Sequence, residues 1–177
     1  MSIFSDLFKE QGKASQLNSK ERLISEGKSL QHFYYVEKGC LRSYVLNDGR
    51  EISFLFHFEG TLILPESLSV DKPALHTVEA IEPSEVYSIS KEQFKELLKE
   101  SKVLQKEIEQ YKYQKLIHYR NLFFSRIADK PQKRYEHLLE KHAEIILRIP
   151  DQYIASFLGI SAVSLSRIKT RINGKPK

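Results

Sequence analysis

The residues whose types and spacing indicate specific chemistry lie near the C-terminus, at positions 161–172. An expected helix there carries Leu165, Ile168 and Ile172 on one side, at i, i+3 and i+7. Its other side is polar, and Arg167 is the strongest candidate on it, because a guanidinium fork bonds guanine O6 and N7 together. The candidate base-reading residues are Ser161, Ala162, Val163, Ser164, Arg167 and Thr170, and the candidate phosphate contacts are Lys169, Arg171, Lys175 and Lys177.

A preceding helix is expected to position this face. The Pro-Asp pair at 150–151 favours a helix start, since proline loses no hydrogen bond there and an acid favours the positive end of the helix dipole. The apolar face of this helix comprises Ile154, Ala155 and Leu158. Gly159 permits the backbone turn that ends it, and Ser161 can cap the next helix. The pattern predicts a helix-turn-helix that reads the DNA major groove, and an ordinary helix pair with a solvated basic face is the alternative.

The distribution of charge favours a polyanionic partner for the C-terminal part. The chain of 177 residues has a net charge of +5. Residues 1–100 carry 12 Lys and Arg against 16 Asp and Glu, a net of −4, whereas residues 101–177 carry 16 against 7, a net of +9. Such asymmetry is typical of a protein whose basic half binds nucleic acid.

Composition narrows the class of protein. With 41% hydrophobic and 29% charged residues, the chain is typical of a soluble globular protein. It has no apolar run approaching the ~20 residues of a membrane span, and residues 1–13 lack the layout of a secretory signal. The single Cys40 makes no internal disulfide and is expected to be a buried strand residue. We therefore expect a cytoplasmic protein that does not contact membranes.

The first half of the chain has the pattern of a β domain. Residues 3–26 predict a mixture of helix and loop, with the apolar residues at 3, 4, 7 and 8 at helical spacing. From Gly27 to about Ile89, short alternating or aromatic runs are separated by turns, and Asp48-Gly49 between two such runs is a strong hairpin signal. These features predict an antiparallel β-barrel or jelly roll.

The pattern becomes helical after Ser90, which is a candidate N-cap. Residues 102–128 are free of Gly and Pro and predict one long helix, which the proline at 131 ends. The apolar stripe of this helix includes Leu104, Ile108, Tyr111 and Leu122, interrupted by Lys115 and His118. Dimerisation through the helix and packing against the chain's own β domain both fit the stripe. A basic helix over 132–142 and a short strand over 145–149 are expected to follow.

These patterns predict an α+β protein with three parts: an N-terminal β domain over 1–100, a connecting helix over 101–128, and a helix-turn-helix domain over 129–177. This order resembles the Crp/Fnr family of bacterial regulators over nearly the whole chain. Residues 33–42 look like the family's strand–Gly–strand signature, 47–51 match its hairpin, and 154–161 with 165–168 match its DNA-binding helices. The resemblance implies a homodimer that binds a two-fold symmetric operator, a small effector sensed by the β domain, and RNA polymerase as a further partner.

The sequence departs from the cyclic-nucleotide-binding members of that family. Those members have a Gly-Glu pair and, further on, an arginine that hold the phosphate. Here Glu66 remains, but Pro65 stands at the glycine position, and no Arg or Lys lies between Pro73 and Ser90. Because a buried phosphate needs a full positive charge or a nest of backbone N–H groups, we expect an effector other than cAMP, or none. The candidate effector-pocket residues are Glu66, Ser67, His76 and Thr77.

A second departure concerns the operator. Val163 stands where members that read the common half-site have a glutamate, and valine cannot accept a hydrogen bond from cytosine N4. Of the usual base readers only Arg167 is matched, so we expect a different target sequence.

Other chemistries have weaker support. The several cysteines of an iron–sulfur site are absent, since Cys40 is alone. His57, Glu66 and His76 raise the alternative of a cupin-like small-molecule- or metal-binding protein or enzyme with a basic helical appendage, although the sequence lacks that family's paired His-x-His ligands. We find no nucleophile–base arrangement and no phosphate-binding Gly-rich loop, so we expect neither an enzyme nor a bound cofactor.

Overall fold

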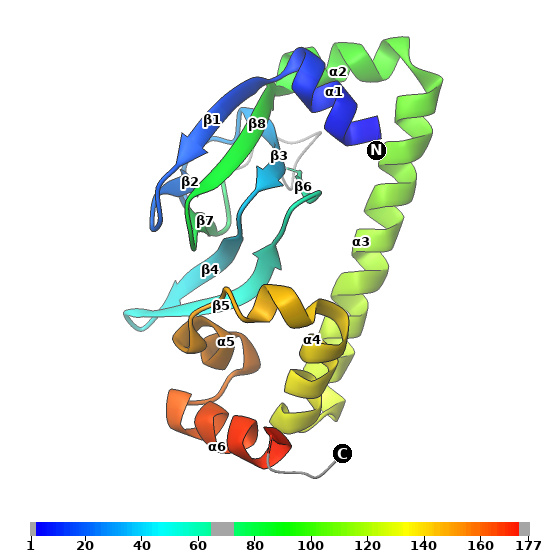
Figure 1. Cartoon of the computed structure of the whole chain (residues 1–177). Helices are drawn as coiled ribbons and strands as arrows, with labels where there is room; N and C mark the ends of the chain where they lie inside the picture. The colour runs from blue at the N-terminus through cyan, green and yellow to red at the C-terminus, as the bar shows by residue number, and fades with distance from the viewer. Residues whose placement is uncertain (1–2, 65–72, 174–177) are drawn as a thin grey trace.

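The computed structural model describes residues 3–64 and 73–173. The helices of this part of the chain are α1 (Ile3–Gln11), α2 (Lys91–Glu100), α3 (Lys102–Ala128), α4 (Pro131–Ile146), α5 (Asp151–Leu158) and α6 (Ala162–Asn173). The strands are β1 (Lys13–Leu17), β2 (Arg22–Ile24), β3 (His32–Lys38), β4 (Leu41–Asn47), β5 (Arg50–His57), β6 (Leu62–Ile63), β7 (Thr77–Ala80) and β8 (Ser84–Ser90). The long α3 runs beside the strands, and the last three helices gather at its lower end (Figure 1).

The strands form two antiparallel four-stranded sheets, in the orders β1-β8-β3-β6 and β2-β7-β4-β5. Apolar side chains of both sheets share one core, which includes Leu17, Ile24, Val36, Leu41, Val78 and Val86. An antiparallel β domain is thereby confirmed. A closed barrel, however, is wrong for the described strands, because the ladder of hydrogen bonds leaves the two sheets separate.

The hairpin between β4 and β5 turns where the sequence predicts it. Asn47 pairs with Arg50, and the two residues between them, Asp48 and Gly49, have φ values of 49° and 73°. Positive φ at both central residues matches the right-handed twist of the flanking strands, and Asp-Gly adopts it at low cost.

The N-terminal segment contains strands that the sequence pattern did not reveal. The helix is present as α1, whose Phe4 and Phe8 are buried, but residues 13–17 and 22–24 are strands instead of loop. β1 lies at a sheet edge and buries only Leu17, so its sequence lacks the regular alternation that marks a half-buried strand.

Two serine caps set the boundaries of α2 and α3. The Ser90 hydroxyl accepts from the backbone N–H of Gln93, as predicted, and the Ser101 hydroxyl accepts from the N–H of Leu104. The long helix spans the 27 residues from Lys102 to Ala128, in agreement with the sequence, and Pro131 opens the next helix.

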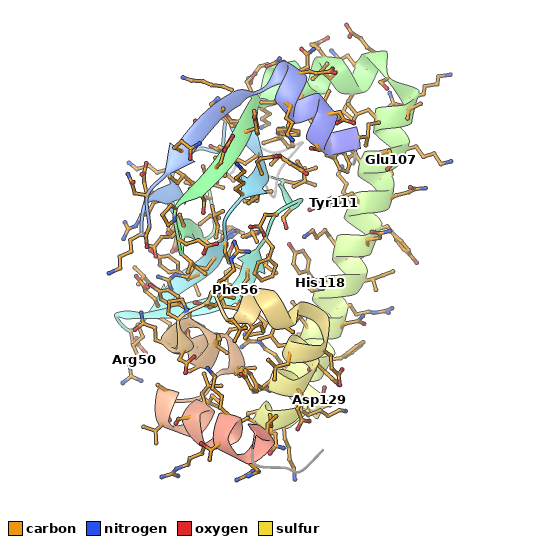
Figure 2. The ribbon with its side chains drawn as sticks, viewed as in Figure 1. Arg50, Phe56, Glu107, Tyr111, His118 and Asp129 are labelled. Atoms are coloured by element: carbon orange, nitrogen blue, oxygen red, sulfur yellow. The ribbon has the colours of Figure 1, made fainter. Side chains whose placement is uncertain are left out.

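The apolar stripe predicted for α3 packs against the chain's own sheets. Leu104 and Ile108 are buried, and Leu122 is half-buried. The Tyr111 hydroxyl donates to the carbonyl of Leu62 (2.6 Å) and accepts from the N–H of the same residue (3.1 Å), so the helix bonds directly to β6. Tyr111 and His118 lie on the side of α3 that faces the sheets (Figure 2).

A second apolar stripe on α3 lies exposed. Tyr113, Leu116, Phe123 and Ile127 have 65, 65, 62 and 70% of their surface accessible. Their spacing of three and four residues, with Arg120 at the middle position, places them along one face of the helix, away from the stripe that packs on the sheets. The described part of the chain offers this face no cover.

The last three helices share a core with the sheets. Ile146 and Ile149 are buried in one cluster with Phe56 of β5 and with apolar residues of α5 and α6. A strand over 145–149 is therefore wrong: α4 continues to Ile146, and a turn leads to α5. Burial of both isoleucines between helices outweighs the strand preference of this β-branched run.

Candidate nucleic-acid interface

The α5–α6 pair is held together mainly by buried apolar side chains. Ile154, Ala155 and Leu158 of α5 are buried, as are Leu165 and Ile168 of α6. All five belong to one cluster, in agreement with the two predicted stripes. Between the helices the chain reverses at Gly159, whose φ of 67° is the left-handed conformation expected there.

The first turn of α6 is held by its cap. The Ser161 hydroxyl accepts from the N–H of Ser164 at 3.1 Å and lies 3.0 Å from the Ser164 hydroxyl. Both hydroxyls are thus occupied within the turn itself. Ala162 and Val163 are exposed beside them, and Val163 has 62% of its surface accessible.

The basic residues of α6 differ in how firmly they are held. Lys169 forms an ion pair with Asp151 at the start of α5, and Arg171 donates to the side-chain oxygen of Gln132 at 3.0 Å. The Thr170 hydroxyl donates to the carbonyl of Ser166 at 3.1 Å. Arg167 is exposed, and its side chain has no hydrogen bond or ion pair within the described residues. Its guanidinium is therefore the one among these three cations that can bind a ligand without first breaking a contact.

The α5 helix is bonded to an edge of the sheet. The Ser156 hydroxyl accepts from the N–H of Ser53 (3.0 Å) and donates to the carbonyl of Glu51 (3.0 Å), both on β5. Nearby, Phe157 of α5 packs on Phe56 of β5 with ring centroids 5.2 Å apart.

A buried arginine strengthens this junction. Arg42 of β4 is 1% exposed and forms ion pairs with Glu51 and with Glu79, the latter at 2.9 Å. Its guanidinium carbon lies 3.8 Å from the ring centroid of Tyr153 on α5 and 4.3 Å from that of Tyr44 on β4. The sheet of β4 and β5 and the helix α5 thus share one cation, which lies between an aromatic ring of each.

A second arginine joins the segment before α5 to the β domain. Arg148 pairs with Glu59 (2.7 Å) and with Glu82, which follow β5 and β7. Sequence reasoning missed the junction roles of Arg42, Ser156 and Arg148, because each has a partner that lies between 37 and 105 residues away along the chain. A strongly polar Arg in an otherwise apolar strand is the only local signal that Arg42 gives.

The predicted effector residues are described in part. Glu66 and Ser67 lie outside the described residues. The His76 ring meets that of Phe54 edge-on at 5.1 Å, and the buried Thr77 hydroxyl accepts from the N–H of Glu26 at 3.2 Å. Thr77 therefore serves a contact between β7 and the turn that follows β2.

A buried histidine lies close to this region. His57 of β5 is 5% exposed, and its Nε2 lies 2.7 Å from the Ser43 hydroxyl, whereas its Nδ1 is buried without a hydrogen-bond partner. Burial, together with the positive charges of Lys115 and His76, lowers the pKa of His57 to about 3. At neutral pH this ring is uncharged, so it cannot supply the cation that a phosphate needs.

Three further observations concern metals, the single thiol and membranes. Among the described residues, no group of three or more His, Cys, Asp or Glu side chains is placed to hold a metal ion. Cys40 is fully buried, and burial raises the pKa of its thiol. None of the described helices combines the length and the apolar character that crossing a bilayer requires.

Comparison with family models finds a match over the β domain. Residues 15–101 match the family model of the cyclic nucleotide-binding domain. No curated protein sequence matches the chain.

Solved structures share the fold of nearly the whole chain. FixK2 from Bradyrhizobium japonicum is 18% identical with a TM-score of 0.82, covering 92% of this chain and 84% of its own. The c-di-GMP responsive global regulator CLP of Xanthomonas campestris is 14% identical with a TM-score of 0.72, covering 96% and 90%. A CooA mutant from Carboxydothermus hydrogenoformans is 13% identical with a TM-score of 0.76, covering 98% and 81%. At these identities the likeness shows a shared fold.

Proposed function

We propose that this chain is a sequence-specific DNA-binding transcription regulator of the Crp/Fnr type. The observation that carries the proposal is the surface of α6, on which Arg167 is exposed and without a partner in the described part of the chain, beside the exposed Ala162 and Val163. In this arrangement α5 and α6 form a helix-turn-helix, and the N-terminal turns of α6 enter the major groove. The net charge of +9 over residues 101–177 favours the same partner.

The contacts of α6 divide its polar residues into three roles. Arg167 reads a base, since its fork is free to bond guanine O6 and N7. Arg171 and Lys169 approach phosphates and exchange their contacts to Gln132 and Asp151 for the DNA backbone. Ser161 and Ser164 act on the helix itself through the cap, so their contribution to base reading is small.

The exposed stripe of α3 supports a homodimer. Tyr113, Leu116, Phe123 and Ile127 repeat with the three-and-four spacing of a two-stranded coiled coil, in which apolar residues of two helices interlock. Two α6 helices would then face half-sites about one helical turn, ~34 Å, apart on a two-fold symmetric operator. RNA polymerase is a further partner that this family role implies.

The three parts of the chain then have separate tasks. The β domain over 1–100 senses a small effector, the helix over 101–128 pairs two subunits, and residues 129–177 bind DNA. The effector is not cAMP bound in the usual manner. Pro65 replaces the expected glycine, and the fully buried cation of the sheets, Arg42, is committed to Glu51 and Glu79.

The test is selection of binding sites from random DNA with the purified chain, followed by affinity measurements on the selected operator and on scrambled DNA at fixed salt. We expect Arg167→Ala to lose ~1–3 kcal/mol on the operator and little on scrambled DNA. Arg171→Ala, the matched control, should weaken binding to both DNAs by the same factor. Failure to enrich any sequence, or equal losses for Arg167→Ala on both DNAs, would contradict base reading by this helix.

A further inference from the structure

A cavity of about 420 Å³ lies where the β domain, the end of α3 and the last helices meet. Its volume is in the ~300–1,000 Å³ range of small-molecule sites. Phe56 of β5, His118 of α3 and Asp129 of the α3–α4 connection all line it, and Figure 2 shows them around this junction. The candidate effector residues His76 and Thr77 do not line it, so this is a separate site.

The walls of the cavity are mainly apolar, and phenylalanines from three elements stand among them. Phe56 comes from the sheet, Phe124 from α3 and Phe157 from α5, and aliphatic residues fill the space between them. Phe124 has 56% of its surface exposed, although a large apolar side chain would ordinarily be covered. Such walls suit a flat apolar body.

Two arginines give the cavity an excess of positive charge. Arg126 and Arg134 both line it, and neither forms an ion pair within the described residues. They donate to backbone carbonyls instead: Arg126 to Phe157 (2.6 Å) and Arg134 to Arg126 (3.2 Å) and Leu158. Burial, together with repulsion from Arg134, lowers the pKa of Arg126. The Nε of Arg134 is buried without any hydrogen-bond partner.

The carboxylate in the lining does not balance these cations. Asp129 pairs with Lys133 at 2.7 Å and accepts from the Ser125 hydroxyl at 2.9 Å, and these contacts lower its pKa. It is therefore ionised and already matched by a cation of its own. The two guanidinium groups remain uncompensated, and an anion placed between them would relieve their repulsion.

We propose that this cavity binds a small organic anion, a flat aromatic body bearing one acidic group, with the body against Phe124 and Phe157 and the acid at Arg126 and Arg134. The proposal concerns this cavity alone and does not depend on DNA binding. Because the site touches the β domain, α3 and α5 together, its occupant would contact all the parts whose relative placement positions α6.

The probe is 8-anilinonaphthalene-1-sulfonate, whose fluorescence rises in apolar sites, titrated into the full chain and confirmed by calorimetry. We expect one site per chain and about tenfold weaker binding of the uncharged N-phenyl-1-naphthylamine, which lacks the sulfonate. Equal affinity for the two compounds would show that the cations take no part and would overturn the proposal.

Two variants and a matched control locate the site. Arg126→Gln should weaken sulfonate binding about tenfold, whereas Lys112→Gln, which removes an exposed cation of the same helix outside the cavity, should leave it unchanged. Leu122→Trp fills the cavity and should abolish binding, with circular dichroism used to verify its fold. Equal effects of Arg126→Gln and Lys112→Gln, or binding that persists in a folded Leu122→Trp, refute the assignment. Binding that disappears as the chain self-associates at higher concentration refutes it too, because the partner subunit then covers the cavity.

Discussion

Replacing Arg42 by methionine tests how the β domain and α5 are held together. Arg42 is 1% exposed, and the side chain of its partner Glu79 is 8% exposed, so both charges are withdrawn from water. Methionine fills most of the space of the arginine stem but leaves the carboxylate of Glu79 buried without a cation. Glu51, the other partner, is 39% exposed and can regain water.

The expected loss follows from that difference in burial. Removing one partner of a buried ion pair costs about 3–5 kcal/mol, because the remaining charge is uncompensated. This cost includes the loss of the arginine's stacking on Tyr153 and Tyr44. The exposed Glu51 adds little to the free energy lost. A loss of that size is a large part of the ~5–15 kcal/mol that stabilises a typical domain.

A second substitution separates the charge from the packing. In Arg42→Met with Glu79→Leu, no buried charge remains, so we expect the double variant to lie within about 1 kcal/mol of the native chain. Arg22→Met is the matched control: Arg22 is exposed on β2 opposite Glu79, and we expect a change within about 0.5 kcal/mol.

Urea unfolding followed by circular dichroism, at pH 7 and one fixed protein concentration, gives these free energies of unfolding. If Arg42→Met costs less than about 1 kcal/mol, the ion pair is not buried as described. If the double variant is as unstable as the single one, the cost lies in packing and not in the stranded carboxylate.

Three further predictions concern assembly, pH and ligand. Leu116→Glu should convert a dimer into a monomer in analytical ultracentrifugation, because it places a charge in the exposed stripe of α3. Gln114→Glu, which lies on another face of the helix, should leave the dimer intact. A monomeric native chain would contradict the assignment of the stripe as an interface. Burial lowers the pKa of His57 to about 3, below the ~6.5 of an unfolded histidine, so only the unfolded state takes up this proton between those values. Stability should therefore fall as pH falls below about 6.5, by up to ~1.4 kcal/mol per pH unit from this group, and His57→Gln should flatten the profile relative to the native chain; identical pH profiles would show that the ring is not buried neutral. Millimolar cAMP should leave the melting temperature unchanged, because only a ligand that binds the folded state raises it, and a clear upward shift would restore cAMP as the effector.

The sequence predicted the features that depend on local pattern. The bounds of α3 follow from a stretch without Gly or Pro and a proline just beyond it, and the α5–α6 pair follows from two apolar stripes around Gly159. The Asp48-Gly49 hairpin is of the same kind, since two adjacent residues determine it.

Features that depend on distant partners were not predictable in this way. The run at 145–149 has strand-forming residues, but tertiary packing against α5, α6 and Phe56 of the distant β5 buries its isoleucines. The second stripe of α3 includes Arg120 and two aromatic residues. It can be recognised as a separate apolar face only when the structure shows that the first stripe packs against the β domain. Arg42 gives no indication of Glu79, because the register that joins them is set by β7 pairing with β4.

The hydroxyls that helices place on the sheets have a consequence for solubility. β6 and β5 each lie at an edge of a sheet, where unpaired backbone groups invite a strand from another molecule. Tyr111 and Ser156 each take one N–H and one C=O of such an edge, so that a single side chain occupies the place of a neighbouring strand. Any rearrangement that lifts α5 from the β domain would uncover the edge of β5 and expose the chain to edge-to-edge aggregation. A protein with this architecture can move its last helices only as far as α5 still covers the open edge of β5.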